Sequence, residues 1–189
     1  MPPLIYLGSR DIAACEIGVA EVTAAVRDAF LASGREQAVL GDALHLRLPN
    51  GTAFSAKGGL LCEQGVAAVK WYGIVPGNRQ RGLADFNPLL MLNDVETGLT
   101  IAIIEGDWIT AVRTAAISAT AAGLLARPES ASLGLIGSGR LAWAHFEALR
   151  DQYPLRHLSI FSRNAATAGE IANEAERHGL SARVCTEAR

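Results

Sequence analysis

The chain has 189 residues, half of them hydrophobic and 19% charged, with a formal net charge of -2. A chain of this size buries roughly 70% of its unfolded surface, so we expect one or two small domains. Its basic residues are scattered, which argues against a nucleic-acid partner. No stretch approaches the roughly 20 uncharged apolar residues of a membrane helix, and the N-terminus lacks a secretory pattern, so we expect no membrane association and a cytoplasmic location.

The cysteines and histidines predict neither a disulfide framework nor a metal site. The three cysteines are widely spaced and form no Cys-x-x-Cys pair, and the four histidines show no metal-ligand spacing. We therefore expect ordinary thiols and no bound metal.

The first two thirds of the chain predict a mixed α/β scaffold. In chain order we expect an amphipathic helix over 19–31, a hairpin of 44–48 with 52–56 closed by Asn50-Gly51, a strand over 66–75, a hairpin of 88–92 with 99–104, and an alanine-rich helix that ends near 126.

Lys70 is a charged residue within the mostly apolar strand predicted over 66–75. Two-residue alternation places it in one row with Val66, Ala68, Tyr72 and Ile74, and an unpaired buried ammonium is costly. Lys70 therefore lies either at a wet strand end or in a pocket where it meets an anion.

Arg113 stands near the start of the predicted alanine-rich helix. With Thr110 as its N-cap, Arg113 and Thr114 fall in the first turn, where the helix dipole disfavours a cation unless an anion binds there. The alternative is an exposed arginine on a good helix former.

The last third predicts half of a Rossmann domain. An apolar strand over 132–136 breaks into Gly137-x-Gly139-x-x-Ala142, and a helix, a strand over 157–161, a helix over 165–178 and a strand over 181–185 follow. The turn allows a pyrophosphate to approach backbone amides at a helix start. The predicted cofactor-binding residues here are Gly137, Ser138, Gly139, Arg140, Leu141 and Ala142.

The residues after the second strand of this unit indicate the cofactor. A carboxylate there would bind the 2′-hydroxyl of NAD, whereas Ser162-Arg163-Asn164 suits the 2′-phosphate of NADP. We predict NADP(H) as the preferred cofactor, with NAD(H) possible. Alternatively, Ser162 or Asn164 caps the next helix and Arg163 is solvated.

Several motifs together resemble the ornithine cyclodeaminase/mu-crystallin family from about residue 9 onward. They are Val69-Lys70-Trp71, Pro76-Gly77-Asn78, Gly82-Leu83, Leu92-Asn93-Asp94, Thr97-Gly98, Glu105-Gly106 and the run from Thr110 to Ala116, followed by the glycine turn. The resemblance implies an α/β fold in two parts: an N-terminal mixed α+β substrate-binding and dimerisation domain over 1–127, then the first half of a Rossmann NAD(P)-binding domain over 128–189.

The resemblance also implies residue roles and a chemistry. Lys70 and Arg113 match residues that position the substrate carboxylate, and Thr114 matches a threonine near the cofactor phosphates. The implied reaction is NAD(P)-dependent hydride transfer at the α-carbon of an amino acid or a cyclic ketimine carboxylate, in a homodimer. The alternatives are ornithine cyclodeamination to proline, and a non-catalytic crystallin-like binding protein.

The chain departs from the family pattern in two places. Ala43 stands where the family has a further substrate arginine; Arg47 is close in sequence, and Lys57 either replaces the missing charge or is solvated. The family also continues beyond the third Rossmann strand, where its acid/base aspartate lies. We therefore expect the isolated 189 residues to be inactive and poorly stable.

Overall fold

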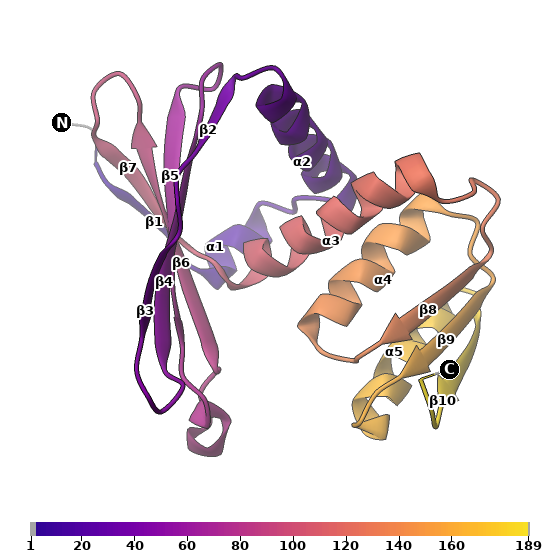
Figure 1. Cartoon of the computed structure of the whole chain (residues 1–189). Coiled ribbons are helices and arrows are strands. Elements are labelled where there is room, and N and C mark those ends of the chain that lie inside the picture. The colour runs from indigo at the N-terminus through magenta and orange to yellow at the C-terminus, as the bar shows by residue number, and fades with distance from the viewer. Residues whose placement is uncertain (1–2, 189) are drawn as a thin grey trace. The chain divides into compact units, whose positions relative to one another are not determined.

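A computed structural model describes residues 3–188, and the chain in it divides into two compact units (Figure 1). One unit comprises Met1–Ile17 and Asp28–Thr110, and the other comprises Gly18–Arg27 and Ala111–Arg189. The sequence predicts a division at 127. In the structure, most of the helix that precedes this position belongs to the second unit. The reason is packing: alanines of that helix lie against Ala144 and Ala148 of the second unit.

The first unit is built on one seven-stranded sheet. Its strands are β1 (Ile5–Leu7), β2 (Ala38–Leu40), β3 (Leu44–Arg47), β4 (Ala53–Leu61), β5 (Val66–Ile74), β6 (Phe86–Asp94) and β7 (Thr100–Glu105). The order is β1-β7-β6-β5-β4-β2, β3 also pairs with β4, and all pairs are antiparallel except β1 with β7. Both expected hairpins are confirmed.

The turn between β3 and β4 forms at Asn50-Gly51, with a positive φ at the glycine. Gly51 adopts φ 85° in the turn between β3 and β4, a conformation that favours glycine, and the Asn50 side chain accepts a 3.0 Å hydrogen bond from the amide of Thr52. The shorter helical elements are α1 (Ser9–Ala14), α2 (Val19–Gly34) and the 3₁₀ turn η1 (Asn78–Arg81).

Helix α3 (Asp107–Leu125) begins four residues earlier than expected from an N-cap at Thr110. The amide of Thr110 donates to the carbonyl of Gly106 at 2.9 Å, so Thr110 lies within the first turn, and the prediction that it is the N-cap is wrong. The acidic Asp107 in the first turn complements the positive end of the helix. Arg113 consequently lies in the second turn, and the argument that it faces the helix dipole no longer holds.

The second unit contains the predicted half-Rossmann arrangement. Strands β8 (Ser132–Ile136), β9 (His157–Phe161) and β10 (Ser181–Cys185) form a parallel sheet in the order β10-β9-β8, linked by α4 (Arg140–Gln152) and α5 (Ala165–Arg177). The predicted α/β fold class is confirmed.

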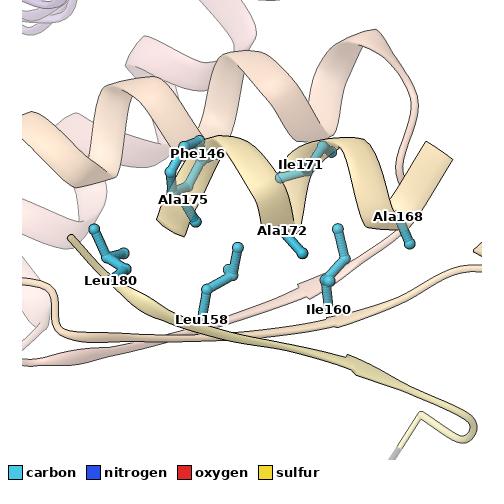
Figure 2. Close-up of a cluster of buried hydrophobic side chains, with 8 residues drawn as sticks. All are labelled: Phe146, Leu158, Ile160, Ala168, Ile171, Ala172, Ala175 and Leu180. Carbon is cyan, nitrogen blue, oxygen red and sulfur yellow. The ribbon is translucent and has the colours of Figure 1, made fainter. Parts of the chain in front are cut away.

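The core of the second unit lies between β9 and its two helices. Figure 2 shows Leu158 and Ile160 of β9 pointing toward Ile171 and Ala172 of α5, with Phe146 from α4 in the same cluster. These side chains are almost completely buried, so this cluster fixes the strand ends that carry the glycine turn.

Among residues 3–188, α3 alone is long and apolar enough for its composition to suit a membrane span. It nevertheless carries Asp107 and Arg113, and four of its alanines are buried within the fold. Core helices share this composition, so it does not by itself indicate a membrane.

Candidate dinucleotide and carboxylate sites

The glycine turn between β8 and α4 has the backbone that its sequence demands. Gly137 adopts φ 113°, which side chains disfavour, and its amide donates a 2.7 Å hydrogen bond to the carbonyl of Phe161 at the end of β9. Gly139 is the N-cap of α4 in an extended conformation, and a Cβ there would meet no atom within 4 Å. Gly137 is thus required by the turn, whereas Gly139 leaves space beside the backbone.

This space fits the phosphates of a dinucleotide. A hollow of about 310 Å³ borders the turn, lined by Leu135, Ile136, Gly137, Gly139, Leu141, Ala142 and His145. The first turn of α4 begins at Arg140, so amides at a helix N-terminus face a site without side-chain obstruction at Gly139. Arg140 and Leu141 are exposed, and Ala142 packs against the core.

Ser138 is only 9% exposed and lies in a chain of hydroxyl groups. Its Oγ donates to Ser162 Oγ at 2.7 Å and lies 2.5 Å from Thr167 Oγ1. Either hydroxyl can be the donor in the second contact, and Thr167 Oγ1 also donates to the carbonyl of Asn164 at 3.2 Å. Ser138 therefore joins the glycine turn to the β9–α5 loop.

Ser162 is left with a hydrogen to donate. Its oxygen accepts from Ser138 and, at 3.2 Å, from the amide of Asn164, which uses both lone pairs. Within residues 3–188 its own O–H has no acceptor, and Arg163 next to it is exposed. A half-buried hydroxyl donor beside a guanidinium is a suitable partner for an anionic oxygen.

Asn164 takes the capping role that the sequence left open. Its Oδ1 accepts from the amides of Ala166 and Thr167 at 3.1 and 3.3 Å, so it is the N-cap of α5. The carbonyl side of this amide is committed to the helix.

His145 was missed by the sequence analysis although it lines the hollow at the glycine turn. Its Nδ1 lies 2.7 Å from the carbonyl of Leu141, which can only accept, so Nδ1 carries the proton. Its Nε2 lies 2.9 Å from the Ser118 hydroxyl of α3 and, in neutral His145, accepts from it. The signal in the sequence is the four-residue spacing of Leu141 and His145 on one helix.

Lys70 is the central residue of the nine in β5, so the interpretation that it lies at a strand end is wrong. It is half-buried, and its Nζ lies 5.0 Å from the ring centroid of Tyr72 and 5.8 Å from that of Phe86. The two rings provide cation–π stabilisation for the ammonium.

Arg113 and Thr114 are half-buried on α3 and belong to the second unit, whereas Lys70 belongs to the first. The Arg113 guanidinium forms no hydrogen bond or ion pair within residues 3–188. A half-buried guanidinium of this kind can accept an anionic ligand.

The described part of the chain contains no group of three or more His, Cys, Asp or Glu side chains that could hold a metal ion. The second unit brings the predicted residues Gly137, Ser138, Gly139 and Ser162 into one connected arrangement, with Thr167 as an addition.

Comparison with known proteins gives a consistent result. The family model for the ornithine cyclodeaminase/mu-crystallin family matches residues 51–189. An alanine dehydrogenase of Archaeoglobus fulgidus is 30% identical over 168 residues, which are 89% of this chain and 51% of that protein.

Two solved structures have the same fold. An archaeal alanine dehydrogenase dimer with bound NAD aligns with a TM-score of 0.91 at 28% identity, over 96% of this chain and 56% of that one. The Thermococcus litoralis Delta(1)-pyrroline-2-carboxylate reductase in complex with NADH and L-proline aligns with a TM-score of 0.90 at 27% identity, over 97% and 57%.

This chain spans about half the length of these relatives. The family model covers most of its residues, including β5, α3 and the glycine turn, and the two structures extend the likeness to almost all of it. The chain belongs to the ornithine cyclodeaminase/mu-crystallin family.

Proposed function

We propose that the full-length protein is an NAD(P)-dependent enzyme that transfers hydride at the α-carbon of an amino acid or cyclic ketimine carboxylate. The observation that carries the proposal is the glycine turn, with Gly137 at φ 113° and open space at Gly139, in a chain of this family. The structural relatives bind NAD, or NADH with L-proline, which supports the same cofactor class.

The geometry of the second unit supports the proposed cofactor-binding residues. Gly137, Gly139 and the first turn of α4 would hold the pyrophosphate, and Thr114 would lie near the phosphates. When bound, the reduced cofactor supplies the hydride that is added to the imine carbon, while the nitrogen takes up a proton. Ser138 holds the turn in register with the β9–α5 loop through its bond to Ser162.

Lys70 and Arg113 would bind the substrate carboxylate. Lys70 is held beside two aromatic rings, and Arg113 is half-buried and has no polar partner within the described residues. Charge-assisted hydrogen bonds to a carboxylate fix the orientation of the α-carbon, and such positioning contributes several kcal/mol to catalysis. Neither residue needs to exchange a proton.

We propose that the enzyme prefers NADP(H) to NAD(H). Ser162 has an O–H available to donate, and the exposed Arg163 adds a positive charge next to it. No carboxylate stands in Ser162-Arg163-Asn164 to bind a free 2′-hydroxyl.

We propose that the protein forms a homodimer through one face of the seven-stranded sheet. Strand alternation and register put exposed apolar side chains on that face: Tyr6, Leu44, Leu46, Phe54, Trp71, Leu89 and Met91. Phe54 and Trp71 stack there with ring centroids 5.8 Å apart. An exposed apolar patch of this kind is typical of a protein interface, and the archaeal relative is a dimer.

The test is a steady-state assay of the full-length protein with NADPH and NADH against cyclic imino acids, pyruvate plus ammonia, and ornithine. Imine-dependent oxidation of the reduced cofactor supports the proposal. Ammonia release from ornithine without net cofactor change assigns a cyclodeaminase instead. Cofactor binding without any turnover assigns a binding protein and refutes the enzyme.

A further inference from the structure

The chain uses lysine at two positions only. Of its 17 basic residues fifteen are arginines, and the two lysines are Lys57 in β4 and Lys70 in β5. All the other basic residues of the chain are arginines. Lys57 and Lys70 therefore carry its two side-chain ammonium groups.

The sheet places these two lysines directly opposite each other. In the antiparallel pairing of β4 with β5, Lys57 is the register partner of Lys70. Opposed residues point to the same face of a sheet, with Cβ atoms about 4.5–5.5 Å apart. Both ammonium groups can therefore reach one small ligand above that face.

Two like charges at opposed positions of a sheet repel each other. The Lys57 side chain is exposed and makes no hydrogen bond or ion pair within residues 3–188. The Lys70 Nζ lies near the rings of Tyr72 and Phe86, which point to the same face. This face thus offers two cations beside an apolar wall, which suits the carboxylate of a small organic acid.

Arg47, a further cation on this face, lies too far along the sheet to take part. Arg47 pairs with Ala53, four residues before Lys57, which is a separation of about 13 Å along the strand. On the β3 side of Lys57 the chain has Ala43, a methyl group, just before Leu44 pairs with Ala56.

We propose that Lys57 is a second carboxylate-binding residue, which shares with Lys70 the carboxylate of the amino or imino acid substrate. This inference rests on the proposed function and adds a specificity-determining residue to its site. Each ammonium donates to one carboxylate oxygen, so the ligand brings a negative charge to two neighbouring cations. Lys57 does not contact the reacting carbon and therefore acts on binding.

The experiment compares full-length wild type with K57M, K57R and, as a matched control on the same face, R47M. Turnover is measured with the imino acids that the wild type accepts, and binding of L-proline, L-alanine and L-ornithine to the cofactor-loaded enzyme is measured by calorimetry. We expect K57M to raise KM and the amino-acid Kd at least about 10-fold, since a hydrogen bond to a charged group is lost. K57R and R47M should stay within about threefold of wild type, and kcat and the cofactor Kd should not change in K57M.

The outcomes separate this inference from the function on which it rests. If the wild type turns over and folded K57M has an unchanged KM and amino-acid Kd, Lys57 is solvated and the inference fails alone. If K57M loses affinity for only one of the three amino acids, Lys57 reads the side chain of that ligand and the shared-carboxylate arrangement is wrong. If the wild type neither binds nor converts any of these compounds, the proposed function fails and the inference with it.

Discussion

The hydroxyl of Ser138, in the glycine turn, donates a 2.7 Å hydrogen bond to the hydroxyl of Ser162, which follows β9. Two loops 24 residues apart in sequence are thereby held at one hydrogen-bond length. The Ser162 oxygen accepts hydrogen bonds from Ser138 and from the amide of Asn164. The hydroxyl hydrogen of Ser162 is therefore available to donate to a ligand.

The first prediction concerns the hydroxyl hydrogen of Ser162. S162A should weaken NADPH binding about 10-fold or more while NADH binding stays nearly unchanged, because only NADPH brings a phosphate for the hydroxyl to bind. Fluorescence titration of the full-length protein with both reduced cofactors gives the two dissociation constants. S159A, the same change three residues earlier in β9, is the matched control. Equal losses for both cofactors in S162A would show that Ser162 only shapes the loop.

The second prediction separates the two glycines of the turn. G137A forces alanine into φ 113° and should cost about 1–3 kcal/mol of stability together with cofactor affinity. G139A has an unstrained backbone and free space at Cβ, so it should cost about 1 kcal/mol or less in stability but lower the affinity for both cofactors. Denaturant unfolding and cofactor titration measure the two effects. Full affinity in G139A would mean that no phosphate approaches this backbone.

Much of the fold could be predicted because its signals are local. The two hairpins follow from alternating residues around turn signals, and the half-Rossmann unit follows from a glycine turn between apolar strands. Strands β1 and β2 were missed because each has three residues, too few for an alternation pattern. Their pairing with strands distant in sequence also leaves no signal in the neighbouring residues.

The site was predicted less completely, for a physical reason. A glycine turn is visible as a motif, whereas the contribution of Thr167 arises only when α5 brings it 2.5 Å from Ser138. The start of α3 was misplaced because a threonine is a better N-cap than most residues, yet the backbone of Gly106 begins the helix. Lys57 could be named as a candidate from sequence, but its position opposite Lys70 depends on strand register.

The third prediction tests the apolar sheet face. W71E places a charge among exposed apolar side chains and should convert a dimer into a monomer at micromolar concentration, because burying an unpaired carboxylate costs several kcal/mol. Size-exclusion chromatography with light scattering measures the mass. L124E, a charge at a more exposed leucine near the end of α3, should leave the dimer intact. A monomeric wild type would refute the proposed assembly.

The fourth prediction concerns pH and the turn between β6 and β7. Hydrogen bonds from the hydroxyl and the amide of Thr97, at 2.5 and 2.8 Å, lower the pKa of the Asp94 carboxyl below its usual value. A carboxyl with a lowered pKa in the folded state stabilises the fold above its unfolded pKa, near 3.8, and this contribution is lost as pH falls through the folded pKa. D94N should therefore lower Tm at pH 7, and the difference from wild type should close in strong acid. Thermal melts across this range measure it, and a constant difference would exclude the ionised carboxyl as the cause.

Lys70 and Trp71 are consecutive in β5, and consecutive residues of a strand point to opposite faces. One peptide bond thus separates the ammonium proposed for ligand recognition from the indole proposed for subunit contact. Any displacement of β5 imposed from the indole side is transmitted mechanically to the ammonium side. Oligomer assembly and ligand affinity should therefore vary together in this protein, even for substitutions that never touch the ligand.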